Sequence, residues 1–199
     1  MKAELQRLQH LRERIEAACQ RAGRDASNVR LLAVSKKQPS ELIRQFFEIG
    51  QTAFGENRAQ EALAKQATLA DLGIEWHFIG PVQSNKTRDL AEHFQWVQSV
   101  DRLKILNHLS QHRPEGLSPL NVCLQVNIDR EAQKSGLDPD QLAAIADAAA
   151  RSPRIRLRGL MAIPRQTGNV DQARDSFRRM RILYQSLREA GHDLDTLSM

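Results

Sequence analysis

The stretch Leu31-Leu32-Ala33-Val34-Ser35-Lys36 has the composition of a buried β-strand that ends on a primary amine. A hydrophobic strand seldom carries an ammonium group into a core, because removing that charge from water is costly or forces the group to lose its proton. A neutral lysine amine is a nucleophile that forms a Schiff base with an aldehyde. Lys36 is therefore a candidate nucleophile. The plain alternative, that Lys36 and Lys37 mark the solvated end of a strand, is favoured by the strand taken alone.

Apolar runs alternate with amphipathic helical stretches along the rest of the chain, which is typical of parallel βα units. Helices are predicted at residues 39–49 and 139–151, where a proline suits the first helical turn. The alternation predicts one closed (β/α)8 barrel over residues 1–199. An open doubly wound sheet is the alternative, but its GxGxxG signature does not occur. The predicted strands are residues 29–36, 52–56, 74–80, 96–100, 120–128, 155–163 and 194–199.

Length and composition bound the class of protein. A chain of 199 residues that is 41% hydrophobic can bury one sizeable core. No apolar run approaches the roughly 20 residues of a membrane span, and the amino terminus reads as a charged amphipathic helix rather than a secretory signal. These features predict a cytoplasmic protein without a membrane partner. Cys19 and Cys123 are far apart in sequence and suggest reduced thiols in the core.

Two other patterns suggest functions of a different kind. The net charge is +5, and residues 174–188 form a helix with five arginines that could bind RNA. Apolar residues at helical spacing, among them Phe177 and Ile182, make a solvated outer face the simpler interpretation. His108 and His112 have the i, i+4 spacing of a zinc site, but no third ligand follows at a suitable interval, so no metal is expected.

Unusual polar residues cluster where the predicted strands end. Lys36 ends the first strand, Asn57 follows the second, and polar segments at 80–86, 127–136 and 161–164 follow later ones. In a parallel barrel the chemistry gathers at the carboxyl ends of the strands. The sequence therefore predicts a site at that end of the barrel.

Five motifs at these strand ends resemble those of the pyridoxal phosphate homeostasis protein family. They are AVSK at 33–36, FGEN at 54–57, WHFIGPVQSNK at 76–86, KSG at 134–136 and RGLMAIP at 158–164. The resemblance runs from the first helix to the last residue. It implies a cytosolic protein with a barrel like the amino-terminal domain of alanine racemase and with pyridoxal 5′-phosphate as its cofactor.

The resemblance implies that Lys36 forms the internal aldimine with the 4′-aldehyde of the cofactor. Period-two alternation that points Lys36 into the barrel also points Val34 and Leu32 inward, and places Ser35 against the surrounding helices. Asn57 is expected to donate to the ring hydroxyl or to a neighbouring side chain. Its alternative is to cap the helix at 58–70.

Two further candidates are expected inside the barrel. His77 should face the interior, either as a hydrogen-bonded core histidine or in contact with the cofactor ring, while Trp76 and Phe78 pack outward. Met161 has a polarizable side chain that suits the pyridine face, and ordinary core filling is equally natural.

The remaining candidates lie on loops. Ser84 and Asn85 precede a helix start, where an anion such as the phosphate could settle, although plain helix capping is the favoured interpretation. Lys134 matches a family lysine near the barrel mouth and could be a second amine for cofactor passage. An exposed loop lysine is the alternative.

The sequence departs from the family pattern after Ser198-Met199. In the family, a serine-bearing loop, another helix and a last strand follow there, bind the phosphate and close the barrel. The chain is therefore expected to be truncated before the last βα unit and to retain the cofactor poorly, since each charge-assisted hydrogen bond to the phosphate contributes about 1.5–3 kcal/mol. The open strand edge would favour self-association, whereas the resemblance favours a monomer.

The leading functional hypothesis is a carrier rather than an enzyme. Such a protein holds pyridoxal phosphate as a lysine aldimine for vitamin B6 homeostasis, limits the free aldehyde and passes it to apo-enzymes or B6 salvage enzymes. An amino-acid racemase is the alternative. It needs acid–base groups on both faces of the cofactor, and Tyr184, the one tyrosine, falls in the arginine-rich helix.

Overall fold

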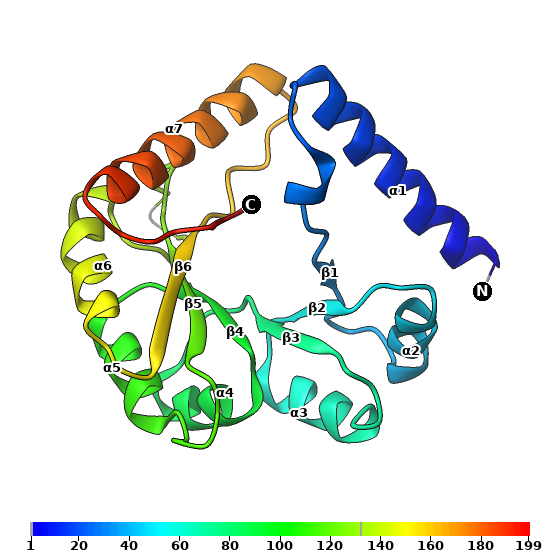
Figure 1. Ribbon diagram of the computed structural model, residues 1–199, viewed down its shortest axis with the longest axis horizontal. Helices are drawn as coiled ribbons and strands as arrows, with labels where there is room; N and C mark the ends of the chain where they lie inside the picture. Colours follow the sequence, from blue (N-terminus) through cyan, green and yellow to red (C-terminus); the bar gives the residue numbers. More distant parts are fainter. Residues whose placement is uncertain (1, 132) are drawn as a thin grey trace. The chain divides into compact units, whose positions relative to one another are not determined.

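The computed structural model describes residues 2–131 and 133–199 (Figure 1). Two compact units make up the chain, Met1–Trp76 and His77–Met199, and each is described in turn. The prediction of one domain over residues 1–199 stays a prediction.

The first unit alternates helices with short parallel strands. Strands β1 and β2 pair in parallel, with Ala33 opposite Phe54 and Val34 opposite Gly55. The amide of Glu75, at the start of β3, donates to the carbonyl of Thr52, so β3 begins alongside β2. The elements are α1 (Lys2–Arg21), η1 (Ala26–Asn28), β1 (Ala33–Val34), α2 (Ser40–Glu48), β2 (Ala53–Glu56), α3 (Ala59–Thr68) and the start of β3 (Glu75–Phe78).

The second unit continues the same alternation. All of its strand pairs are parallel, and their order in the sheet follows their order in the sequence. Its elements after β3 are η2 (Ser84–Lys86), α4 (Thr87–His93), β4 (Trp96–Val100), α5 (Leu103–His112), β5 (Leu120–Gln125), η3 (Pro139–Gln141), α6 (Leu142–Ala150), β6 (Ile155–Met161), α7 (Val170–Glu189) and β7 (Thr196–Ser198).

Burial explains why these runs form strands. Every residue of β2 and of β4 is buried, as expected for parallel strands that are covered on both faces. In the second unit, Val97, Val122 and Leu160 have no exposed surface and form the centre of the core. Fully buried residues on α5, such as Leu106, cover the sheet from the helix side.

The seven predicted strands are confirmed, and all except β4 are shorter than predicted. The main error is at the first strand, which runs from Ala33 to Val34 instead of from Val29 to Lys36. The helix predicted at 39–49 begins at Ser40, and Pro39 precedes its first turn. The helix predicted at 139–151 divides into a 3₁₀ turn that contains Pro139 and the α-helix α6. No helix in the described parts of the chain has the length and apolar character needed to span a membrane.

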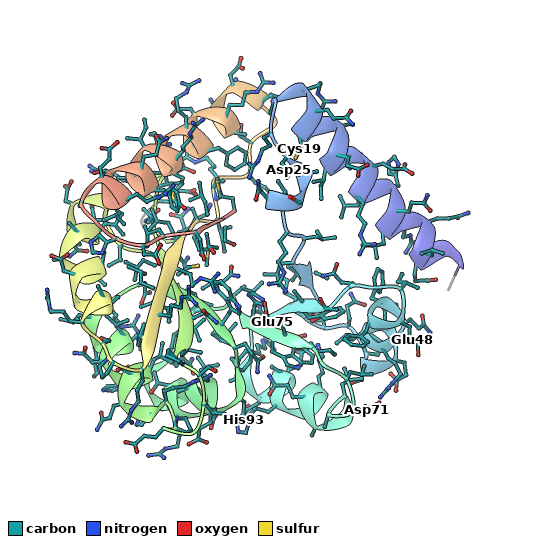
Figure 2. The ribbon with its side chains drawn as sticks, in the orientation of Figure 1. Cys19, Asp25, Glu48, Asp71, Glu75 and His93 are labelled. Atoms are coloured by element: carbon teal, nitrogen blue, oxygen red, sulfur yellow. The ribbon has the colours of Figure 1, made fainter. Side chains whose placement is uncertain are left out.

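Both cysteines are free and buried: Cys19 on α1 (Figure 2) and Cys123 on β5. Burial raises the pKa of the Cys123 thiol to about 12, because the thiolate would lose its hydration. We therefore expect iodoacetamide at about pH 8 to leave Cys123 unmodified in the folded protein, since the thiolate is the reactive form. Peptide mass mapping before and after unfolding in urea measures this. Rapid labelling of Cys123 in the folded protein would contradict the burial.

Candidate functional site

Lys36 lies in a tight turn that leaves the sheet after β1. The Ser35 carbonyl accepts a hydrogen bond of 3.0 Å from the amide of Gln38, which places Lys36 and Lys37 in the middle of the turn. Lys37 has a positive φ of 61°. The Lys36 side chain is exposed, and its amine has no hydrogen-bond or ion-pair partner in the described parts of the chain.

The expectation that burial activates the Lys36 amine is therefore wrong. The physical reason is that the strand pairing ends at Val34, so that Lys36 belongs to the turn and not to a buried strand. The exposure matches the alternative of a solvated strand end. It leaves the assignment of Lys36 as the cofactor-binding amine a prediction, which then depends on position instead of desolvation.

The predicted alternation of faces holds as far as the strand pairing extends. Val34 pairs with Gly55, and Lys36 and Asn57 each lie two residues further along, beyond the ends of β1 and β2. Ser35 points to the opposite face, where it is buried. That Lys36 and Asn57 share the face opposite to Ser35 stays a prediction.

A buried ion-pair network lies on the opposite face. Glu56 has no exposed surface, and its Oε1 accepts hydrogen bonds of 2.6 Å from Ser35 Oγ and 2.7 Å from Lys65 Nζ. Lys65 Nζ also donates to the Ser35 carbonyl at 2.8 Å and to Glu61 Oε1 at 2.7 Å. A carboxylate of β2, a carboxylate of α3 and the carbonyl that directly follows β1 thus converge on one ammonium group.

The same network reaches the second residue of the turn. Glu61 Oε1 accepts a 2.6 Å hydrogen bond from the backbone amide of Lys37. The hydrogen bond from Lys65, and then that from the Lys37 amide, hold the pKa of the Glu61 carboxyl below its usual value. Glu61 is therefore a carboxylate at neutral pH, and this bond to the turn weakens only as the pH falls through that lowered pKa.

Sequence reasoning missed Glu61 and Lys65. A signal was available, because a glutamate four residues before a lysine on a helix is a favourable ion-pair spacing. That spacing alone does not show that the pair turns inward to a buried glutamate on the neighbouring strand.

Asn57 is half-buried at the end of β2. It does not cap the following helix: the capping position of α3 is Arg58, which makes no side-chain capping bond. The capping alternative is wrong because α3 begins one residue later than that role requires. Contact between Asn57 and the cofactor stays a prediction.

His77 is buried in the second unit and hydrogen-bonded. Its Nδ1 lies 2.8 Å from Gln98 Nε2, and its ring stacks on Trp96 at 5.1 Å between centroids. Gln98 Oε1 in turn accepts a 2.7 Å hydrogen bond from Ser198 Oγ of β7. A hydrogen bond from β7 to β4, across two intervening strands, requires the sheet of this unit to curl. The core-histidine alternative describes these contacts, and contact with the cofactor stays a prediction.

Met161 is 3% exposed and packs in a buried cluster with Trp96 and Cys123. Since His77 stacks on the same Trp96 ring, the structure brings His77 and Met161 to one part of the second unit. Phe78 is also buried and meets Phe94, directly after α4, at 5.6 Å between ring centroids. This agrees with the expected outward direction of Phe78. Contact between Met161 and the pyridine face stays a prediction.

Ser84 and Asn85 form a 3₁₀ turn ahead of α4. Neither side chain caps that helix, since its capping position is Lys86 without a side-chain bond. Thr87 Oγ1 instead donates to the Ser84 carbonyl at 2.9 Å, so the turn is closed by a backbone acceptor. The capping expectation is thus wrong for both residues, and their role toward a phosphate stays a prediction.

Lys134 is half-buried and has several partners. Its Nζ donates to the carbonyls of Ile163 at 3.2 Å and Pro164 at 3.1 Å, and lies 2.8 Å from Glu131. Lys134 therefore ties the loop after β5 to the segment after β6, unlike the exposed loop lysine of the alternative. Its role as a second amine stays a prediction.

The other sequence candidates have local partners. His112 Nδ1 lies 3.2 Å from Thr87 Oγ1, and the described residues contain no group of three or more His, Cys, Asp or Glu side chains placed to hold a metal. On α7, Arg179 pairs with Asp129 at 2.6 Å. Phe177 and Ile182 are exposed on the same helix and do not contribute to the core.

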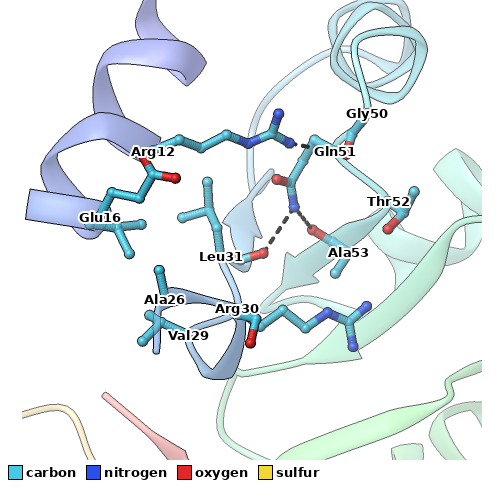
Figure 3. Close-up of a pocket in the computed structure, with 12 residues that line it drawn as sticks. Arg12, Glu16, Ala26, Val29, Arg30, Leu31, Gly50, Gln51, Thr52 and Ala53 are labelled. Carbon is cyan, nitrogen blue, oxygen red and sulfur yellow. Dashed lines mark hydrogen bonds between the residues drawn. The ribbon is translucent and has the colours of Figure 1, made fainter. Parts of the chain in front are cut away.

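The first unit also contains a cavity of about 580 Å³ between α1, the segment before β1 and the start of β2 (Figure 3). Arg12 donates to the Gly50 carbonyl at 3.2 Å on one side, and Gln51 donates to the carbonyls of Leu31 and Ala53. None of the predicted site residues lines this cavity.

Parallel strands in sequential order that alternate with helices are typical of α/β barrel proteins. The family model of the alanine racemase N-terminal domain matches residues 6–199. An alanine racemase of Clostridium difficile shares this fold, with a TM-score of 0.71 at 10% identity over 85% of this chain and 45% of that chain. The predicted fold class is therefore confirmed.

Relatives with higher sequence identity indicate the family within this fold. A pyridoxal phosphate homeostasis protein of Pseudomonas aeruginosa is 57% identical over 94% of this chain and 80% of its own length. One of Haemophilus influenzae is 45% identical over 95% of this chain and 81% of its own. PipY of Synechococcus elongatus, solved with PLP bound, has a TM-score of 0.80 at 34% identity over 93% of this chain and 87% of that chain. The chain belongs to the pyridoxal phosphate homeostasis protein family.

Proposed function

We propose that this protein binds pyridoxal 5′-phosphate through Lys36 and serves vitamin B6 homeostasis. The names of the relatives and the PLP-bound structure of PipY support the cofactor and the role. The observation that carries the assignment to Lys36 is local: its amine is exposed and unpartnered in the described parts of the chain, while both neighbouring residues of the turn are held by hydrogen bonds. A reactive amine needs that combination of access and fixed position.

The residues present fit such a cofactor. When bound, the cofactor would supply an aldehyde, the group that a lysine amine can capture covalently. Lys36 supplies that amine. Asn57, expected on the same face, supplies an amide that can donate to a ring oxygen. In the second unit, Gln98 holds the ring of the candidate His77 through a hydrogen bond at Nδ1.

We further propose that the protein is a carrier without turnover. Racemization needs a second acid–base group, and the hydroxyl of Tyr184 donates to the Leu194 carbonyl at 2.7 Å. That hydroxyl is thus engaged at the far end of α7 and is a poor candidate. Transfer to apo-enzymes or salvage enzymes, a cytoplasmic location and a monomeric state belong to the same proposal.

Lys36→Ala is expected to abolish the absorbance change that follows addition of excess pyridoxal phosphate, because it removes the amine to which the proposal assigns the cofactor. The cofactor is added in excess so that Lys36 is saturated even if the protein binds the phosphate group weakly. Lys104→Ala, which removes an exposed amine from α5, is the control and should respond as the wild type does. An unchanged response of Lys36→Ala would defeat the assignment.

The carrier proposal has its own test. We expect no exchange of the α-proton when the protein, the cofactor and free amino acids are incubated in D₂O. Exchange that depends on Lys36 would establish a racemase-like activity instead.

A further inference from the structure

We propose that Glu56, Glu61 and Lys65 are positioning residues that hold the Lys36 turn in its reactive geometry. This inference rests on the proposed function of Lys36. It concerns residues that do not touch the cofactor and act through the backbone on either side of the reactive amine.

The residue before Lys36 is held at two atoms. The Ser35 hydroxyl donates to Glu56 at 2.6 Å, and the Ser35 carbonyl accepts from Lys65 at 2.8 Å. Since that carbonyl also closes the turn with Gln38, the ammonium group of Lys65 stabilises the turn directly. Movement of this backbone would break a charge-assisted hydrogen bond.

The residue after Lys36 is held in an unusual conformation. Lys37 has a φ of 61°, which costs energy for a residue with a long side chain. Such conformations persist where the surroundings determine them, and they occur often at functional sites. Here the Lys37 amide donates to Glu61 at 2.6 Å, and Lys65 holds Glu61 from the helix.

The burial of this network argues against a purely stabilising role. A buried ion pair adds little net stability, because desolvation offsets the attraction. Glu56 has no exposed surface, and its second oxygen, Oε2, is buried with no hydrogen-bond partner in the described parts of the chain. An arrangement this costly, placed directly under a reactive turn, is explained by the geometry it imposes.

The two lysines therefore have opposite roles. Lys65 donates to the Ser35 carbonyl and to two carboxylates, so the three donors of its amine are all engaged within the network. Lys36 has no such acceptor among the described residues. Lys65 holds the backbone of the turn, and Lys36 is the residue that reacts.

The test uses the double variant Glu56→Gln with Lys65→Met, which removes both charges together and leaves no buried ion unpaired. Two quantities are measured: the hydrogen-exchange rate of the Lys37 amide in the protein without cofactor, and the rate at which excess pyridoxal phosphate and borohydride label Lys36. We expect exchange to accelerate and labelling to slow by about tenfold or more each, the effect of losing one charge-assisted hydrogen bond.

The matched control removes an exposed ion pair of the same unit. Arg44 forms two hydrogen bonds of 2.6 and 2.8 Å with Asp71, which is labelled in Figure 2, and the double variant Arg44→Met with Asp71→Asn should change neither rate. If the first double variant does not fold, Glu61→Gln replaces it, because Glu61 is partly exposed and its change leaves Glu56 and Lys65 paired. It should accelerate exchange at Lys37 and slow labelling in the same sense.

Each outcome is decisive. Unchanged exchange at Lys37 would show that the network does not hold the turn, and faster exchange with unchanged labelling would show that it holds the turn without assisting the reaction. Either result overturns the inference and leaves the proposed function intact. Absence of the label from Lys36 in the wild-type protein would instead overturn the proposed function, and the inference with it.

Discussion

Lys65→Met is expected to lower the free energy of unfolding by about 3–5 kcal/mol, because it leaves the buried carboxylate of Glu56 without its cation. Glu56 has no exposed surface, and Lys65 Nζ lies 2.7 Å from its Oε1. Among the described residues, the Ser35 hydroxyl alone would still donate to that carboxylate. Urea denaturation followed by circular dichroism measures the change.

The control for this prediction is the double variant in which both charged side chains of the buried pair are replaced by neutral ones. Glu56→Gln combined with Lys65→Met should recover most of the lost stability, since no buried charge remains unpaired. The exposed pair of Arg44 and Asp71 offers a comparison, and its removal should leave the free energy of unfolding close to that of the wild type. A stability of Lys65→Met equal to that of the wild type would show that Glu56 is hydrated and that the network is not buried.

The second large effect is expected at Gly159, in the middle of β6. A Cβ built on Gly159 would lie 1.7 Å from the carbonyl oxygen of Thr196, which pairs with it on β7. Because that atom belongs to the backbone, no side-chain rotation can relieve the overlap. Gly159→Ala should therefore separate β7 from β6 and cost about 3 kcal/mol or more, the upper range for overpacking in a core.

Gly168→Ala is the matched control in the same unit. A Cβ on Gly168 meets nothing within 4 Å, so the change should stay within about 0.5 kcal/mol. The Gly159 variant should also break the hydrogen bond from Ser198 to Gln98, which depends on the position of β7. Wild-type stability of Gly159→Ala, with the Ser198 amide still protected from exchange, would show that β7 is not held as described.

The order and type of the elements could be predicted because they depend on local composition. Buried runs such as 96–100 carry their strand signal in every residue, and the observed β4 has the predicted bounds. The first strand was predicted too long because its apolar composition continues toward Lys36 while the pairing with β2 does not. Where a strand leaves a sheet depends on its partner, and a single sequence does not show that.

The site could be predicted only in part. The burial of Ser35 on the helix side follows from period-two alternation. The exposure of the Lys36 amine does not, nor does the contact of Lys65 with Glu56, since both depend on packing between β1, β2 and α3. The link from Gln98 to Ser198 joins residues 100 positions apart and carries no local signal.

The capping predictions failed for a related reason. Asn57, Ser84 and Asn85 are residue types that often cap helices. Helices α3 and α4 nevertheless begin at positions where no side chain makes a capping bond. The strand ends and turns that deliver the chain to each helix decide where it starts, and those are tertiary features.

The most direct test of the central claim is chemical. The protein is mixed with excess pyridoxal phosphate, reduced with borohydride so that the carbon–nitrogen bond becomes a stable secondary amine, and digested for peptide mass mapping. We predict that the pyridoxyl group is found on Lys36. A label on Lys37 or Lys134 in preference to Lys36, or one spread evenly over the exposed lysines, would contradict the assignment.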